Sequence, residues 1–211
     1  MSDALEETDI EIYADLSDTR AGAFFYVPRP EPRGLMDLVR AAGMPRAGHK
    51  KLANVPEAEI AIGEWGPVVG ALARRREYSR HVALEIFFSF YDWSEFYEGT
   101  DYRARATHPV EEDPALPLAH AFRDTCLRLD SEVGVLTLNN MVSDTEYQEK
   151  EVYPLVLEEN VYRLAAWAGL LYLNDDLKDL LLGTEELERQ DQLPIERGLL
   201  LFGGRGVKRW H

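Results

Sequence analysis

The stretch from Tyr91 to Tyr102 interleaves acidic residues with five aromatic rings. Aromatic side chains supply a large contact area at low entropic cost, and carboxylates attract and pair with Arg and Lys of a basic partner. The stretch therefore predicts a protein-binding surface. Its predicted contact residues are Asp92, Trp93, Glu95, Tyr97, Glu98, Asp101 and Tyr102, extended by Glu111, Glu112 and Asp113. The alternative is that the rings of Trp93, Phe96 and Tyr97 pack inward as a short helix and leave only the acids in solvent.

The overall charge favours a partner with a basic surface. The 211 residues contain 23 Lys and Arg against 38 Asp and Glu, a net charge of −15, which repels nucleic acid and anionic lipid. The charge is unevenly distributed. Residues 20–51 are mostly basic and Arg74, Arg75, Arg76 and Arg80 add a second basic patch, whereas residues 144–159 and 175–196 are acidic. The alternative is that the acidity serves solubility or reflects a salt-tolerant host.

Residue patterns typical of a catalytic or metal site are weak. Neither the His-x-x-x-His nor the Glu-x-x-His spacing that holds zinc or a di-iron centre occurs around the five histidines, which are His49, His81, His108, His120 and His211. The i, i+4 spacing of His120 and Asp124 favours a surface hydrogen bond over a catalytic dyad. Cys126 falls on the apolar side of the same predicted helix and is expected to be buried and unreactive. We therefore predict no catalytic residue, no metal and no cofactor.

Two further motif types give no support for a catalytic or phosphate-binding site. The glycine-rich residues 203–208 lack the spacing of a phosphate-binding loop, and the sequence contains no Gly-x-Ser-x-Gly elbow. Carboxylates are abundant, so a metal-assisted hydrolase built from the same acidic segments is kept as an alternative function.

The compartment is predicted from three negative features. The N-terminal residues 1–11 are acidic and lack the basic and apolar regions of a secretory signal. No apolar run reaches the roughly 18–20 residues that a membrane-spanning helix needs. The single cysteine cannot form an internal disulfide, which fits a reducing compartment. Together these features predict a cytoplasmic protein without a membrane segment.

Hydrophobic periodicity predicts one α+β domain over residues 1–211, with a mixed or antiparallel sheet flanked by helices. Helices are expected at residues 34–42, 68–78, 115–129, 145–153, 160–167 and 176–182. Strands are expected at residues 9–16, 23–27, 57–65, 82–90, 133–138 and 198–202, the last of them before a basic tail. Residues 170–173 could form a strand or extend the helix at 160–167, and Gly169 favours a break. The first two strands are expected to form a hairpin through residues 17–22, and Gly43 is expected to cap the first helix.

The second half of the chain resembles a known class of proteins. It contains, in order, the segments FRDTCLRL (122–129), EVGVL (132–136), VYPLVL (152–157), GLLYL (169–173) and LPIERGLLLF (193–202). This arrangement resembles immunity proteins encoded beside bacterial polymorphic or contact-delivered toxins. The resemblance covers residues 115–205 and rests on the order of elements, so it transfers no individual functional residue.

The resemblance implies a cytoplasmic antidote that binds a cognate toxin domain and blocks its active site. This agrees with the charge, because many such toxins act on nucleic acid and present basic clefts that an acidic surface can occupy. The predicted function is therefore a toxin-neutralising immunity protein. The alternatives are the metal-assisted hydrolase and a structural or assembly subunit of a phage or secretion particle.

Overall fold

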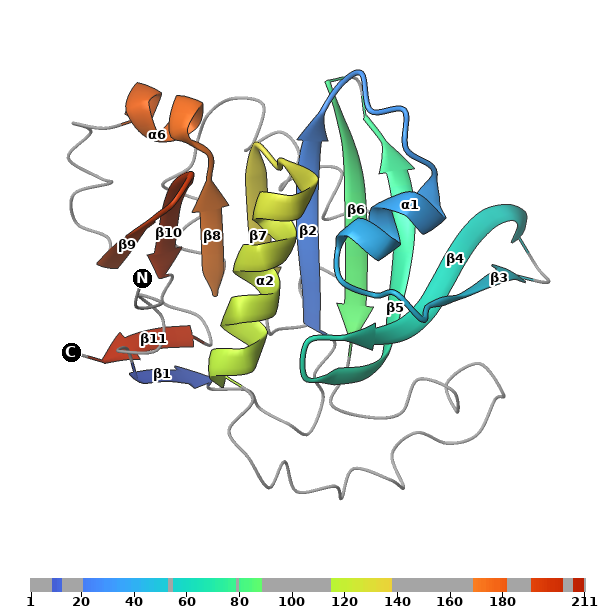
Figure 1. Cartoon of the computed structure of the whole chain (residues 1–211), viewed down its shortest axis with the longest axis horizontal. Helices are drawn as coiled ribbons and strands as arrows, with labels where there is room; N and C mark the ends of the chain where they lie inside the picture. Colours follow the sequence, from blue (N-terminus) through green and yellow to red (C-terminus); the bar gives the residue numbers. More distant parts are fainter. Residues whose placement is uncertain are drawn as a thin grey trace.

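A nine-stranded antiparallel sheet dominates the computed structural model, with strand order β3-β4-β5-β6-β2-β7-β8-β10-β9 (Figure 1). The structure describes residues 9–12, 21–52, 55–78, 80–88, 115–137, 169–181, 191–202 and 207–210. The sheet strands are β2 (Ala21–Pro28), β3 (Gly48–Leu52), β4 (Val55–Trp65), β5 (Val68–Glu77), β6 (His81–Phe88), β7 (Val133–Thr137), β8 (Leu170–Leu173), β9 (Asp191–Ile195) and β10 (Gly198–Phe202). The helices are α1 (Leu35–Ala41), α2 (Ala115–Leu129) and α6 (Asp175–Leu181). The predicted antiparallel sheet is confirmed, but the described fold is mostly sheet rather than an even mixture of helix and strand.

The expected hairpin between the first two strands is wrong. Strand β1 (Asp9–Ile12) pairs instead with β11 (Val207–Trp210) in a separate two-stranded ribbon, while β2 lies between β6 and β7. The residues of β2 explain its central place. Residues 22–27 are all buried, and a strand that is apolar on both sides suits the middle of a sheet that is covered on both faces. β11 also shows that residues 198–202 are not the last strand of the chain.

Residues 68–78 form a strand, β5, and not the predicted helix. Ala71 and Ala73 face the core, whereas Arg74 and Glu85 lie opposite each other across β5 and β6. The missed signal is the two-residue turn Gly66-Pro67, which joins paired residues Trp65 and Val68. Gly66 has a φ of 55°, the left-handed conformation that glycine adopts readily at the first position of a tight hairpin turn. Pairing with two neighbouring strands thus outweighed the local helical periodicity.

The other described elements follow the prediction more closely. The helices at α1, α2 and α6 and the strands at β2, β4, β6, β7, β8 and β10 are confirmed to within a few residues. The cap at Gly43 is also confirmed, since this residue has a φ of 91° and the next amide, of Met44, donates to the carbonyl of Val39. Strands β3 and β9 were not predicted. The helices expected at 145–153 and 160–167 fall outside the described residues.

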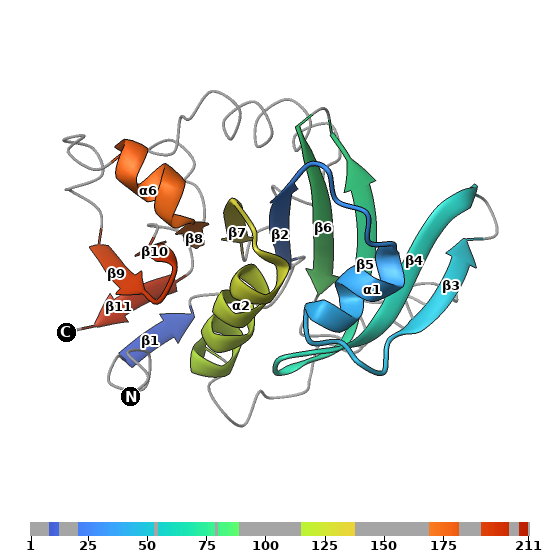
Figure 2. The ribbon, with the colours of Figure 1, turned by 45° about the horizontal axis from the view of Figure 1, so that its top comes forward.

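Helices α1 and α2 cover one face of the sheet (Figure 2). Phe25 of β2 packs against Phe122 of α2 and Trp65 of β4, with ring centroids 5.6 and 6.0 Å apart. The Trp65 indole N–H donates to the Thr125 hydroxyl, which in turn donates to the carbonyl of Ala42, so these two buried side chains are satisfied. None of the helices in the described parts of the chain is long and apolar enough to cross a membrane.

The opposite face, which we call the second face, is also buried. Its aliphatic residues, at 0–2% exposure, include Val133, Val135, Leu171, Leu173, Leu199 and Leu201. Burial on both faces explains why β8 and β10 are uninterrupted apolar runs instead of alternating ones. It also means that any charged residue on this face needs a partner.

Candidate functional site

The predicted contact residues all lie between the end of β6 and the start of α2. Asp92, Trp93, Glu95, Tyr97, Glu98, Asp101, Tyr102, Glu111, Glu112 and Asp113 therefore fall outside the described residues. We call residues 89–114 the acidic segment. What the structure does define is where this segment is attached, because its neighbours Phe88 and Ala115 belong to β6 and α2.

The strand register places the attachment points at one end of the sheet. Phe88 pairs with Ala21, Thr137 with Gly22, and Leu170 with Leu136. Helix α2 also begins at this end, which is the lower end in Figure 1. We call it the Phe88 end of the sheet. The acidic segment joins β6 to α2, and residues 138–168 join β7 to β8, so all four attachment points lie at this end.

Nearly all the net charge belongs to residues outside the described part. The described residues contain 16 Lys and Arg and 17 Asp and Glu, a net charge of −1, while the others contain 7 and 21, a net charge of −14. The acidic segment alone has 2 basic and 7 acidic residues, and residues 138–168 have 2 and 6. The sheet and its helices are thus close to neutral, and the two most acidic connections are both tethered at the Phe88 end.

Two of the four arginines in the predicted second basic patch, Arg74 and Arg75, pair with acidic residues of the protein. Arg74 pairs with Glu85, and Arg75 pairs with Glu77 at 2.5 Å. Arg29 pairs with the second carboxylate oxygen of Glu77 at 2.6 Å. The hydrogen bonds from Arg75 and Arg29 lower the pKa of Glu77. These pairs reduce the positive potential that would otherwise oppose a basic partner.

A cluster of ionisable residues on the second face was missed by the sequence reasoning. It consists of Arg74, Tyr78, His81, Glu85 and Glu132. Arg74 Nε and the Tyr78 hydroxyl both donate to the carboxylate of Glu85, which is 0% exposed, with the Tyr78 bond at 3.2 Å. Burial is the main reason why the pKa of Tyr78 is raised, and the negative charge of Glu85 raises it further. The signal available in the sequence was Glu85 within an otherwise apolar strand, since a buried acid needs a cation.

His81 extends this cluster to β7. Its Nε2 donates to Glu132, whose backbone amide donates to the carbonyl of Tyr26 at 2.8 Å. The Tyr26 ring meets the edge of the His81 ring with the centroids 6.2 Å apart. These contacts link β6, β2 and the α2–β7 connection. The cluster pairs opposite charges across the sheet, an arrangement that stabilises the fold.

The other chemistry-bearing residues have structural roles. Cys126 is buried as predicted, and this burial raises the pKa of its thiol well above the usual value, so it remains a protonated, unreactive core residue. Asp124 pairs with Arg123 at 2.7 Å and with Arg128 at 3.7 Å. Among the residues that the structure describes, no group of three His, Cys, Asp or Glu is arranged to hold a metal ion.

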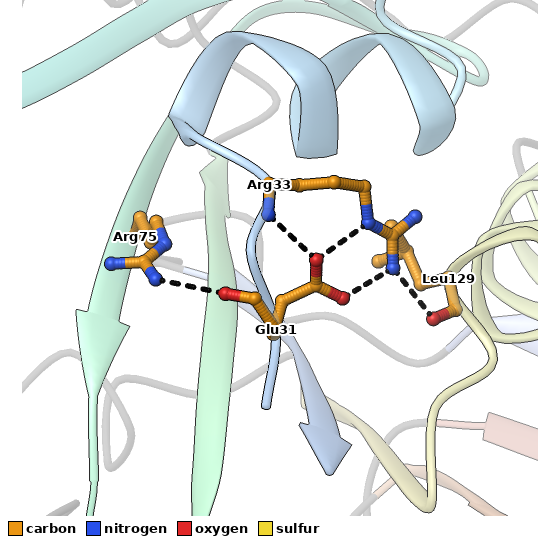
Figure 3. A network of polar contacts seen from close by, with 4 residues as sticks. All are labelled: Glu31, Arg33, Arg75 and Leu129. Carbon is orange, nitrogen blue, oxygen red and sulfur yellow. Dashed lines mark hydrogen bonds and ion pairs between the residues drawn. The ribbon is translucent and has the colours of Figure 1, made fainter. Parts of the chain in front are cut away.

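A second polar network connects the segment before α1 to the end of α2 (Figure 3). Arg33 Nε donates to Glu31 Oε1 at 2.8 Å, and Arg33 Nη2 donates both to Glu31 Oε2 and to the carbonyl of Leu129, at 2.5 and 3.1 Å. Arg75 reaches the carbonyl of Glu31 at 3.5 Å. The hydrogen bond from Arg33 is the main reason why the pKa of Glu31 is lowered.

This network closes the C-terminus of α2. Asp130 has a φ of 56°, and the amide of Ser131 donates to the carbonyl of Cys126 at 3.0 Å, as in a Schellman cap. Arg33 then donates to the carbonyl of Leu129, and Arg197 donates to that of Leu127, which also accepts from the amide of Asp130. Their positive charge at a helix C-terminus is also favourable to the helix dipole. The helix that follows the acidic segment is therefore held firmly at its far end.

Replacing Arg33 with Ala should lower the free energy of unfolding by about 2 kcal/mol, because Glu31 and the Leu129 carbonyl would lose their donor. The side chain of Glu31 is only 5% exposed, so water would replace the guanidinium poorly. Arg40→Ala is a matched control that breaks the Arg40–Asp37 pair, whose side chains are 60% and 64% exposed, and it should cost under about 0.5 kcal/mol. Urea denaturation measures both. Equal losses in the two variants would contradict the role assigned to Arg33.

The contact between His81 and Glu132 should make stability dependent on pH. The hydrogen bond from His81 is the largest effect on the pKa of Glu132, and it lowers this pKa below its usual value of 4.5. A carboxylate with a lowered folded-state pKa stabilises the fold above its unfolded-state pKa, and this contribution is lost as the pH falls through the folded-state value.

Glu132→Gln should therefore lower the free energy of unfolding by about 1–2 kcal/mol at neutral pH. The difference from the wild type should shrink as the pH falls below 4.5, where the native carboxyl group becomes protonated. Denaturant unfolding of both proteins across this range tests the expectation. A difference that stays constant down to strongly acidic pH would show that Glu132 does not act through its charge.

No family model, curated protein or solved structure matches this chain.

Proposed function

We propose that this chain is an immunity protein that binds and neutralises a cognate bacterial toxin domain in the cytoplasm. The observation that supports it most is the partition of charge. A nearly neutral sheet carries two strongly acidic connections whose ends meet at the Phe88 end. An acidic surface of this kind suits a partner with a basic cleft, such as an enzyme that acts on nucleic acid.

The proposed mechanism has two steps. The negative charge of the acidic segment speeds the encounter with the basic toxin surface by electrostatic steering. Aromatic residues of the same segment, Trp93, Tyr97 and Tyr102, then act as anchors that slow dissociation, since buried aromatic side chains commonly dominate binding energy at interfaces. The bound protein occupies the toxin cleft and excludes the substrate.

The attachment of the acidic segment favours this role. One end continues directly from β6, which is paired along its length with β5 and β2 near the middle of the sheet. The other end continues into α2, which packs against β2 and is capped at its far end by Arg33 and Arg197. Fixing both ends to a rigid body lowers the entropy that binding has to remove.

The direct test is to express the protein together with the toxin domain encoded by the neighbouring gene. We expect cells to survive only when both proteins are present, and we expect the two to purify as one complex. The association rate should fall steeply as salt is added, because long-range attraction is screened. Survival without a complex, or a stable homo-oligomer that does not bind the toxin domain, would contradict the proposal.

A further inference from the structure

We draw no further inference here: the strongest candidate, the outer edge of the terminal strand β3, where the exposed residues Gly48 and His49 adjoin the basic residues Lys50 and Lys51, carries no proposal because nothing in the structure shows what covers it.

Discussion

Reversing the charge of Glu95, Glu98 and Asp101 to Lys should abolish protection against the proposed toxin partner. Each change turns an attraction to a basic partner into a repulsion, and like charges facing each other across an interface cost several kcal/mol. We expect the affinity for the toxin domain to fall at least about 1000-fold, which corresponds to about 4 kcal/mol. Cell survival and a titration of the purified proteins measure the two effects.

The control must separate a local effect from the change in total charge. Glu64, Asp179 and Glu196 are exposed acids on β4, on α6 and in the turn between β9 and β10. Replacing all three with Lys changes the net charge by the same six units, from −15 to −9. This control should retain protection and slow association only slightly. If the control loses protection as fully as the first variant, the binding surface has been assigned to the wrong residues.

The control variant should unfold near the wild-type midpoint, because charge changes at exposed positions rarely alter stability by more than about 0.5 kcal/mol. The same unfolding measurement shows whether the first variant still folds. Protection that survives the change at Glu95, Glu98 and Asp101, in a protein that still folds, would refute the role of this part of the acidic segment. Replacing Trp93 with Ala is a complementary test of the anchor. It should mainly raise the dissociation rate, whereas the charge reversals should mainly lower the association rate.

The second large effect is expected for Glu85→Ala. Glu85 is fully buried and accepts hydrogen bonds from Arg74 and Tyr78, and the Arg74 guanidinium also lies 4.8 Å from the centre of the Phe87 ring. Removing one partner from a buried ion pair leaves the other charge poorly compensated and typically costs 3–5 kcal/mol. Because the Arg74 side chain is 31% exposed, we expect about 3 kcal/mol, or a fall of about 10 °C in the melting temperature.

Two further variants isolate the cause. Glu85→Gln keeps an acceptor for the Tyr78 hydroxyl and removes only the charge, so its loss of stability should be intermediate. The double variant Arg74→Met, Glu85→Leu removes both charges, and buried pairs replaced by apolar residues often lose little stability. We expect it to be clearly more stable than Glu85→Ala. The single variants Arg74→Met and Glu85→Leu complete the comparison. If the double variant loses as much free energy of unfolding as these two single variants together, Arg74 and Glu85 do not interact.

Much of the local structure follows from the sequence because it depends on contacts between near neighbours. The spacing of Leu118, Phe122 and Cys126 identifies the apolar face of α2, and all three residues are buried. Gly43 was recognised as the cap of α1, since glycine adopts the left-handed conformation without steric cost. The predicted contact residues between 92 and 113 and the single-domain assignment remain predictions.

Strand pairing was harder to predict because it joins residues far apart in the chain. The first strand pairs with residues near the C-terminus, and the residues next to it in the chain do not indicate this partner. The run from Val68 to Glu77 has a helical periodicity of its own, but β4 and β6 on either side provide hydrogen bonds only to an extended chain.

By itself the sequence determined the large net charge of this protein, its acidic segment with six aromatic rings, and most of its helices and strands. Only the tertiary structure decided which polar side chains meet, because Arg74 and Glu85, or His81 and Glu132, are brought together by strand pairing rather than by proximity in the chain. It also decided that the two acidic connections share one end of the sheet. The physical reason is that an antiparallel register fixes where each strand begins and ends relative to its neighbours.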